Sequence, residues 1–305
     1  MTRLKCSWLS LLKRTYTAWS DDRALRFGAA LAYYSLFSIA PLLIIAISLA
    51  GFIFGEAAAR NEILNQLAGI LGPKAAIGIQ SLVLSGADRP KSAAATAIGI
   101  ITLLIGACGV FAQLKDALNT IWGVRIKPGG AVKQFIRDYI LSFGMVLAIG
   151  FLLTVSLLLT TALQAIIHYM AWLLPKPALT ACFTEICSFL LLSALFGAIY
   201  KVLPDVRLSW RDVWVGAVVT GILFTVGKYL IALYLATSSI SSSFGAAGAL
   251  IILLIWIYYS AVIFFFGAEF TKTYSRECGG GVVPGRHAVF VTQDMKVEQG
   301  VEEPL

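Results

Sequence analysis

The sequence predicts an all-α integral membrane protein with six transmembrane helices, both termini in the cytoplasm, and short amphipathic helices in the first outer and first inner loops. Hydrophobic residues make up 59% of the 305 residues and charged residues 13%, whereas soluble proteins average about 45–50% and about 25%. Six stretches are apolar over the ~20 residues that a helix needs to span a bilayer. This composition excludes a soluble cytosolic enzyme, a disordered chain and a disulfide-stapled secreted module.

The chain divides into three predicted parts. Residues 1–28 form a cytoplasmic amphipathic segment, residues 29–268 a six-span membrane domain, and residues 269–305 a cytoplasmic, largely disordered tail. The predicted spans cover residues 29–54, 93–112, 139–163, 180–200, 213–235 and 246–268. Most of the 24 Lys and Arg residues lie in the two terminal segments and in alternate connections. Because cytoplasmic loops are enriched in Lys and Arg, this pattern predicts that both termini are cytoplasmic.

The N-terminal segment is predicted to be a helix that lies in the inner headgroup region. Its apolar residues share one side of a helix: Leu4, Trp8, Leu11 and Trp19. Basic residues are interspersed, which is typical of interfacial helices. Asp21 and Asp22 are predicted to lie in the first turn of the next helix, where negative charge is favourable. No apolar run ends at a small-residue cleavage site, so we expect no removable signal sequence.

Two connections are predicted to contain amphipathic helices. In the outer connection, residues 55–92, Gly72 and Pro73 divide a helical pattern of apolar residues into two short helices. In the first inner connection, a short helix is predicted from about Gln113 to Gly123, with its apolar residues on one face.

Two ionisable residues lie deep inside predicted spans. Lys228 is placed roughly 10 Å below the outer end of the fifth span, and Glu185 is placed at a similar depth in the antiparallel fourth span. An ionised group at mid-membrane costs about 2.5–3.5 kcal/mol on insertion scales. Two interpretations stay open: a structural ion pair, or a substrate or proton site.

Backbone and small-residue features give weaker predictions. Pro41 lies in the middle of the first span and predicts a kink, which is either a hinge or a fixed bend. Small residues four positions apart predict close helix packing: Gly51 with Gly55, Ala217 with Gly221, and Gly245 with Ala249. The pair Gly51 and Gly55 also leaves a homo-oligomer open.

No cofactor, metal site or nucleic-acid partner is expected. The net charge of +8 is assigned to membrane orientation. Residues 221–229 differ from a phosphate-binding loop, because five residues instead of four separate the glycines and Tyr229 replaces the magnesium-binding Ser or Thr. The two histidines, His168 and His287, are too far apart in the sequence to suggest a two-metal nuclease site. The chain is therefore not predicted to be an enzyme.

Four segments resemble a known family in their order and spacing. They are AALAYYSLFSIAPLL at residues 29–43, ALNTIWGV at 117–124, YKVLPD at 200–205, and FGAAGALIILLIWIYYSAVIFFFGAEF at 244–270. Together they resemble the YihY/BrkB family of bacterial inner-membrane proteins. Members often have Tyr where this chain has Phe244, so this position lacks a hydroxyl group for hydrogen bonding.

The resemblance implies a multi-pass protein of the bacterial inner membrane, generally treated as a transporter or exporter, with lipid or envelope precursors among the suggested cargo. The matched motifs contain these candidate positions: Tyr33, Tyr34, Pro41, Tyr200, Pro204 and Glu269. Glu269 corresponds to the acid of the family's Gly-Ala-Glu motif, near the inner end of the sixth span. The family's other name, ribonuclease BN, is not transferred, because the sequence shows no metal-ligand set.

We therefore expect a transporter or flippase, not driven by ATP on its own, that moves an amphipathic or anionic substrate such as a lipid or an anionic small molecule. In this hypothesis Lys228 binds the anionic group, Glu185 is its counter-ion in the empty state, and Glu269 opens or closes the inner side. Pro41 and Pro204 are candidate kink or gating positions. The alternative is a scaffold or envelope-assembly factor that holds partners through its inner helices and tail. A membrane-associated ribonuclease is the least favoured hypothesis.

Overall fold

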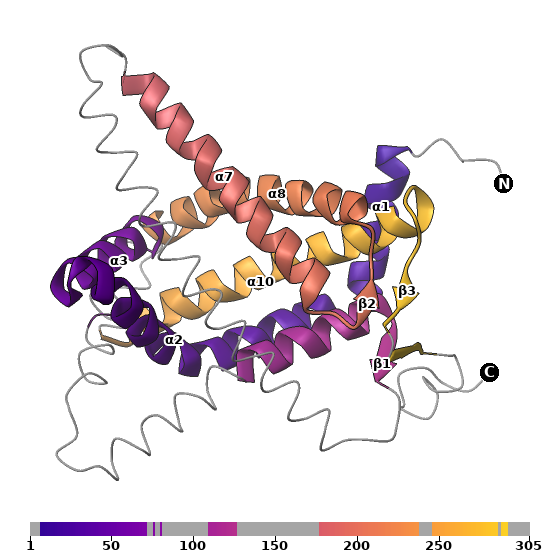
Figure 1. The fold of residues 1–305 in the computed structure, drawn as a ribbon, viewed down its shortest axis with the longest axis horizontal. Coiled ribbons are helices and arrows are strands. Elements are labelled where there is room, and N and C mark those ends of the chain that lie inside the picture. Colours follow the sequence, from indigo (N-terminus) through magenta and orange to yellow (C-terminus); the bar gives the residue numbers. More distant parts are fainter. Residues whose placement is uncertain are drawn as a thin grey trace, which may run out of the picture.

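The computed structural model describes residues 7–71, 76, 80, 109–126, 177–237, 246–285 and 288–291. The helices in these residues are α1 (Trp8–Asp21), α2 (Ala24–Phe54), α3 (Glu56–Leu71), α7 (Pro177–Val202), α8 (Trp210–Thr237) and α10 (Ala246–Glu277). Residues 109–122 are also helical. The strands are β1 (Val124–Ile126), β2 (Val206–Arg207), β3 (Val283–Pro284) and β4 (Ala288–Phe290). Figure 1 shows α2, α8 and α10 running along one direction, with α7 crossing them diagonally.

Three helices of the described residues are long and apolar enough to cross a membrane: residues 185–202, 210–235 and 250–277. They match the predicted fourth, fifth and sixth spans. The predicted first span lies within α2. The third span, and the second except for residues 109–112, lie outside the described residues. The multi-pass helical character is therefore confirmed, while the number of six spans and the side on which the termini lie stay predictions.

Helix α8 packs between α7 and α10 because both of its contact faces carry small residues. A Cβ atom on Gly221 would lie 2.4 Å from Ser193 Oγ on α7. On the other face, a Cβ atom on Gly216 would lie 1.8 Å from Thr271 Oγ1 on α10. Small residues allow helices in membranes to approach closely. The predicted packing role of the small residues around Gly221 is confirmed.

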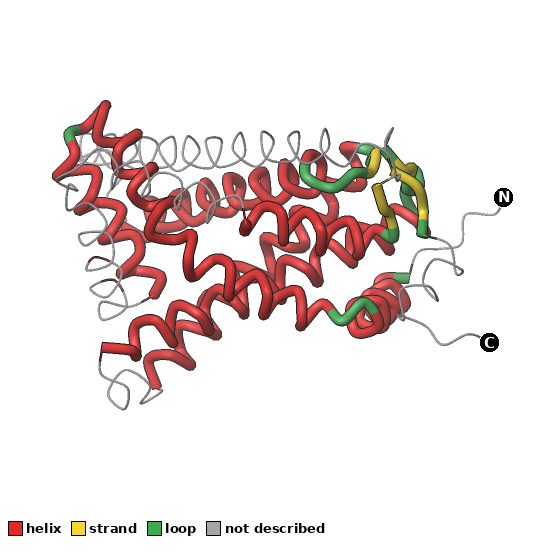
Figure 2. The backbone as a smooth tube through the Cα atoms, turned by 90° about the horizontal axis from the view of Figure 1, so that it is seen from below, coloured by secondary structure: helices red, strands yellow, loops and turns green. Residues whose placement is uncertain are grey.

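Helix α1 lies across one end of the long helices, as the two views in Figures 1 and 2 show. Leu11 and Thr15 are buried there. Trp8 stacks on Phe270 of α10 with 6.3 Å between ring centroids. This crosswise placement agrees with the predicted interfacial helix. Since α3 lies at the opposite end, we call the end that holds α1 the inner end, following the predicted orientation.

The start of α2 differs from the prediction. Asp21 is the last residue of α1 and Asp22 is its C-cap, so neither lies in the first turn of α2. The chain turns at Arg23, which has a positive φ of 53°. The two carboxylates therefore end one helix instead of beginning the next, and Asp22 forms an ion pair described below.

The α2–α3 turn explains one glycine pair that the sequence left ambiguous. Gly55 has a φ of 86°, and a Cβ atom on Gly51 would lie 3.1 Å from the Cα atom of Glu56. Both glycines therefore serve a tight turn within the chain, where side chains are disfavoured. Helix α3 covers the residues of the first of the two predicted outer helices, and its place in an outer loop stays a prediction. The second lies outside the described residues apart from residues 76 and 80.

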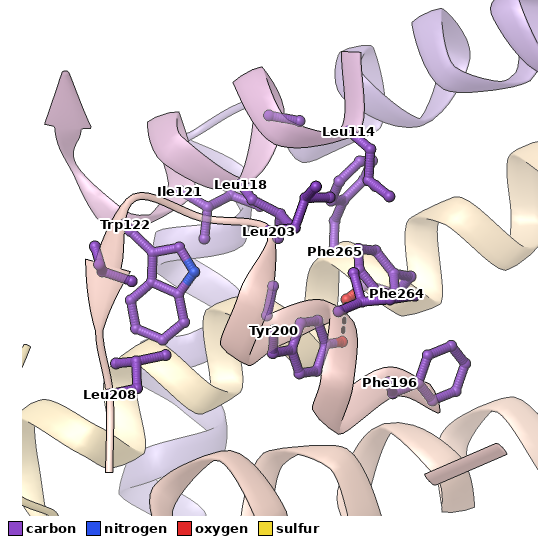
Figure 3. Close-up of a cluster of buried hydrophobic side chains, with 14 of the residues drawn as sticks. Leu114, Leu118, Ile121, Trp122, Phe196, Tyr200, Leu203, Leu208, Phe264 and Phe265 are labelled. Atoms are coloured by element: carbon purple, nitrogen blue, oxygen red, sulfur yellow. Dashed lines mark hydrogen bonds between the residues drawn. The ribbon is translucent and has the colours of Figure 1, made fainter. Parts of the chain in front are cut away.

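The main hydrophobic core lies toward the inner end. Trp122, Tyr200 and Phe265 are fully buried there, and Figure 3 shows them converging from three separate segments. The helix of residues 109–122 provides the predicted apolar face, with Leu118 and Ile121 buried. This helix ends before Gly123, as predicted, but it is already helical at residue 109, since Val110, Phe111 and Ala112 contain no helix breaker.

The predicted disordered tail is wrong for residues 269–285 and 288–291, which are ordered. Helix α10 continues to Glu277. Strand β3 pairs antiparallel with β2, and β4 pairs antiparallel with β1. The all-α prediction missed these two short strand pairs, because each strand is completed by a segment far away in the sequence. The tail thereby connects to both inner loops.

Asp212 fixes the turn where the tail leaves α10. Its Oδ2 atom accepts hydrogen bonds from Ser275 Oγ at 2.8 Å and from Gly280 N at 3.1 Å. The Asp212 side chain is buried in the first turn of α8, where negative charge is also favourable.

Replacement of Asp212 by alanine is expected to lower the free energy of unfolding by about 1–3 kcal/mol, because it removes an acceptor from buried donors. The tail strands should also detach more readily. Limited proteolysis of detergent-solubilised protein should therefore cleave residues 279–291 faster than in the native protein. The exposed Asp116 gives the matched control, Asp116→Ala. Equal cleavage rates in both variants would contradict the assigned role.

Candidate functional site

The ion pair of Lys228 and Glu185 connects two antiparallel helices. Lys228 Nζ lies 3.1 Å from Glu185 Oε2. Lys228 is 18 residues from the start of α8, and Glu185 is 17 residues from the end of α7. Both therefore lie about 25–27 Å from the inner ends of their helices at about 1.5 Å per residue. This agrees with the similar depths expected from the sequence.

The surroundings of this pair are partly open. The side chains of Lys228 and Glu185 are 34% and 55% exposed. Tyr229 Oη donates a hydrogen bond to Glu185 Oε1 at 3.4 Å, and the Lys228 ammonium lies 4.9 Å from the centroid of the Tyr229 ring. The carboxylate thus contacts an ammonium and a phenol hydroxyl, and part of its surface stays exposed.

A second charged group lies at the inner end. Glu269 is fully buried, and its Oε2 atom lies 2.9 Å from Lys272 Nζ. The same ammonium lies 2.9 Å from Asp22 Oδ2. One turn before Glu269, Phe265 packs edge-on against Phe27 of α2. We call Asp22, Glu269 and Lys272 the inner triad; it joins the α1–α2 junction to α10.

A third polar group holds the α7–α8 connection. Asp205 Oδ2 lies 3.0 Å from Lys115 Nζ and accepts a hydrogen bond from Asn119 Nδ2 at 3.1 Å. Asn119 Oδ1 in turn accepts a hydrogen bond from Asp205 N at 2.8 Å. Pro204 lies in this connection, after the last residue of α7. It therefore does not kink a helix, because proline ends helices at such positions.

The remaining sequence candidates lie on α2. Tyr33 and Tyr34 are both more than a third exposed, and their rings meet edge to face with centroids 5.8 Å apart. Pro41 lies within α2, which is assigned as one helix through this residue. A kink or gating role for Pro41 stays a prediction.

The structure therefore brings Lys228 and Glu185 together but separates them from Glu269. Gly227, next to Lys228, packs against Tyr259 and Ile263 of α10. Glu269 lies six to ten residues further along α10, which corresponds to about 9–15 Å toward the inner end. No group of three or more His, Cys, Asp or Glu residues that could hold a metal ion is present in the described part of the chain.

Comparison with known proteins identifies the family. The chain matches the family described as virulence factor BrkB over residues 15–289. The chain belongs to the BrkB family. It is 28% identical to a UPF0761 membrane protein from Mannheimia succiniciproducens, over 89% of this chain and 92% of the relative. It is also 24% identical to a UPF0761 membrane protein from Psychrobacter sp., over 95% of this chain and 52% of the relative. The chain thus spans about half the length of the Psychrobacter protein. No solved structure matches.

The segments that resemble the BrkB family converge at the inner end. Tyr200 Oη donates a hydrogen bond to the carbonyl oxygen of Phe264 at 2.7 Å, as the dashed line in Figure 3 shows. Asn119 of the segment 117–124 donates a hydrogen bond to Asp205, which lies in the same segment as Tyr200. Leu31 of the first-span segment belongs to the same core. The family segments therefore build one structural unit.

Sequence reasoning assigned no site role to most of the charged residues of the inner end, namely Asp22, Lys115, Asp205, Asp212 and Lys272. Their positions do not indicate a site, because each lies near the end of a span, where charged residues are common in any membrane protein. The spacing of Glu269 and Lys272 was the one usable signal, since residues three apart share a helix face.

Proposed function

We propose that this BrkB-family chain is a transporter or flippase that moves an amphipathic or anionic substrate across the bacterial inner membrane without using ATP itself. The observation that carries the proposal is the ion pair of Lys228 and Glu185. Both residues lie within helices long and apolar enough to span a membrane, and both side chains are partly exposed.

The partial exposure argues for a polar pathway. Charged side chains at membrane depth are costly next to lipid, and they usually face a bundle interior or a water-filled cavity. If the pair served only to join α7 and α8, we would expect both side chains to be buried between the two helices. Instead, Glu185 retains an exposed surface beside Tyr229. An anionic headgroup that displaced Glu185 would find an ammonium and a phenol hydroxyl at one level.

In this mechanism Lys228 binds the anionic group of the substrate, and Glu185 neutralises Lys228 when the site is empty. The exchange of one anion for another keeps the ammonium paired at every stage, which limits the cost of charge in the membrane. The inner triad joins α10 to the α1–α2 junction, so its release would allow these helices to separate at the inner end. Glu269 is accordingly assigned to opening and closing the inner side.

Leaflet exchange of fluorescent lipids in proteoliposomes tests this function. Vesicles that contain the native protein should exchange a labelled anionic lipid faster than empty vesicles, and faster than they exchange a zwitterionic lipid with the same acyl chains. Equal rates with and without protein for lipids, together with no uptake of soluble anions, would refute the transport function.

The alternative function is a membrane scaffold. The ordered tail, paired to both inner loops, gives the inner end a fixed surface that a partner protein would recognise. In that case the Lys228–Glu185 pair is structural, and its replacement by apolar residues should leave stability and partner capture unchanged. No catalytic step is expected in either function, and an assay of RNA hydrolysis by the purified protein checks this.

A further inference from the structure

The inner triad contains a buried carboxylate with an incomplete set of partners. Glu269 has no exposed surface, and its Oε2 atom has the Lys272 ammonium at 2.9 Å. Its Oε1 atom has no hydrogen-bond partner among the described residues. Buried polar atoms are nearly always paired, and an unpaired charged oxygen is costly. The site therefore calls for one more positive group beside Oε1.

Counting the charges leads to the same conclusion. Lys272 Nζ is shared between Glu269 and Asp22, at 2.9 Å from an oxygen of each. One ammonium and two ionised carboxylates leave a net charge of −1. Lys272 from α10 and Asp22 from the α1–α2 junction are the charged groups that act on Glu269. Three other charged residues described at the inner end have partners elsewhere: Lys115 with Asp205, Asp212 with Ser275, and Arg14 with Glu277.

We propose that Glu269 is a proton-binding site, because one ammonium is shared between its carboxyl group and that of Asp22. Asp22 Oδ2 and Glu269 Oε2 each lie 2.9 Å from the same Lys272 ammonium, so the two carboxyl groups lie on either side of one cation that can neutralise only one of them. A proton makes the triad neutral and gives Glu269 a donor. Two carboxylates that share one site commonly hold a single proton in this way.

The geometry favours a proton over a metal ion. A cation such as Na⁺ or Ca²⁺ needs several oxygen ligands, whereas in the described residues the buried carboxylate oxygens without a hydrogen-bond partner belong to Glu269 alone, and its Oε2 atom already lies 2.9 Å from the Lys272 ammonium. The Lys272 ammonium also lies close enough to repel a second cation. A proton needs no further ligands and fits in the fully buried space.

This inference deepens the proposed function by naming its coupling ion. The transport half of the inference rests on that function, whereas proton binding does not. When Glu269 loses its proton, its carboxylate competes with Asp22 for Lys272. The contact between α10 and the α1–α2 junction then changes at the inner end. Proton binding and release at Glu269 would thereby open and close the inner side.

Infrared spectroscopy of the protein in lipid nanodiscs at neutral pH tests the site. Exposed carboxyl groups are ionised at this pH, so a protonated carboxyl band comes from buried groups. The native protein should show such a band, and Glu269→Gln should lose it. The matched control is Glu277→Gln on the same helix, whose side chain is partly exposed and paired with Arg14; this variant should keep the band. If Glu269→Gln does not fold, Lys272→Met and the double variant Lys272→Met/Glu269→Gln provide the same comparison.

Each outcome decides one part of the inference. Absence of the band, or its persistence in Glu269→Gln, overturns proton binding. Loss of the band when sodium replaces choline in the buffer would assign the site to a metal cation and also overturn it. In the transport arm, a pH gradient should change lipid exchange by the native protein but not by Glu269→Gln. If the rate of lipid exchange by the native protein does not change with the pH gradient, proton coupling is overturned. Absence of any lipid exchange, together with no uptake of soluble anions, refutes the proposed function and leaves the band as the test of the site.

Discussion

Replacement of Lys272 by methionine is expected to lower the free energy of unfolding by about 3–5 kcal/mol at alkaline pH and by much less in acid. Lys272 is largely buried and is the cation shared by Glu269 and Asp22. Removal of one partner of a buried pair leaves a charge without compensation. In acid a proton on Glu269 replaces the lost charge, so stability falls as the pH rises. Denaturant unfolding in micelles over a pH series measures this.

A double variant separates the missing cation from a packing defect. Lys272→Met/Glu269→Gln removes both charges while it keeps the shapes of the side chains similar. It should recover most of the lost stability and should lose the pH dependence, because buried pairs can often be replaced together. If Lys272→Met were as stable as the native protein at alkaline pH, the inner triad would not be a buried charged group.

Replacement of Gly267 by alanine is expected to destabilise the protein by about 1–3 kcal/mol, the usual cost of overpacking. A Cβ atom at Gly267 would lie 2.0 Å from Thr220 Oγ1 and 2.7 Å from Tyr200 Oη. The hydrogen bond from Tyr200 to Phe264 holds the phenol in place, so relief of the clash requires α10 to move away from α7 and α8. Thermal unfolding of the variant in detergent should therefore begin at a lower temperature.

Gly197 on α7 is the matched control. A Cβ atom at Gly197 would lie 3.5 Å from Ala217 Cβ, which is an ordinary contact. Gly197→Ala should be neutral or stabilising, since alanine favours a helix over glycine by about 1 kcal/mol. If both variants were equally stable, the close approach of α10 to α8 would not depend on Gly267.

The long helices could be predicted from the sequence because a membrane span requires a continuous apolar run of nearly fixed length. The similar depth of Lys228 and Glu185 could be predicted for a related reason. The rise per residue of a helix is constant, so counting from the inner ends of two antiparallel spans places both residues at one level.

The tail strands and the inner polar groups could not be predicted in the same way. Residues 279–291 contain four glycines and a proline, which indicate disorder when the segment is considered alone. Within this segment, β3 and β4 form by pairing with β2 and β1, which lie far away in the sequence. Asp205 and Lys115 are likewise separated by a long stretch of chain. Contacts of this kind leave no local pattern of spacing.

The central claim is that the Lys228–Glu185 pair serves transport and not only stability. It is tested most directly by leaflet exchange of a labelled anionic lipid in proteoliposomes with the double variant Glu185→Gln/Lys228→Met, beside the native protein and Lys13→Met on the exposed side of α1. The account predicts that the double variant unfolds at the native temperature but exchanges lipid no faster than empty vesicles. Exchange at the native rate by the folded double variant would contradict it.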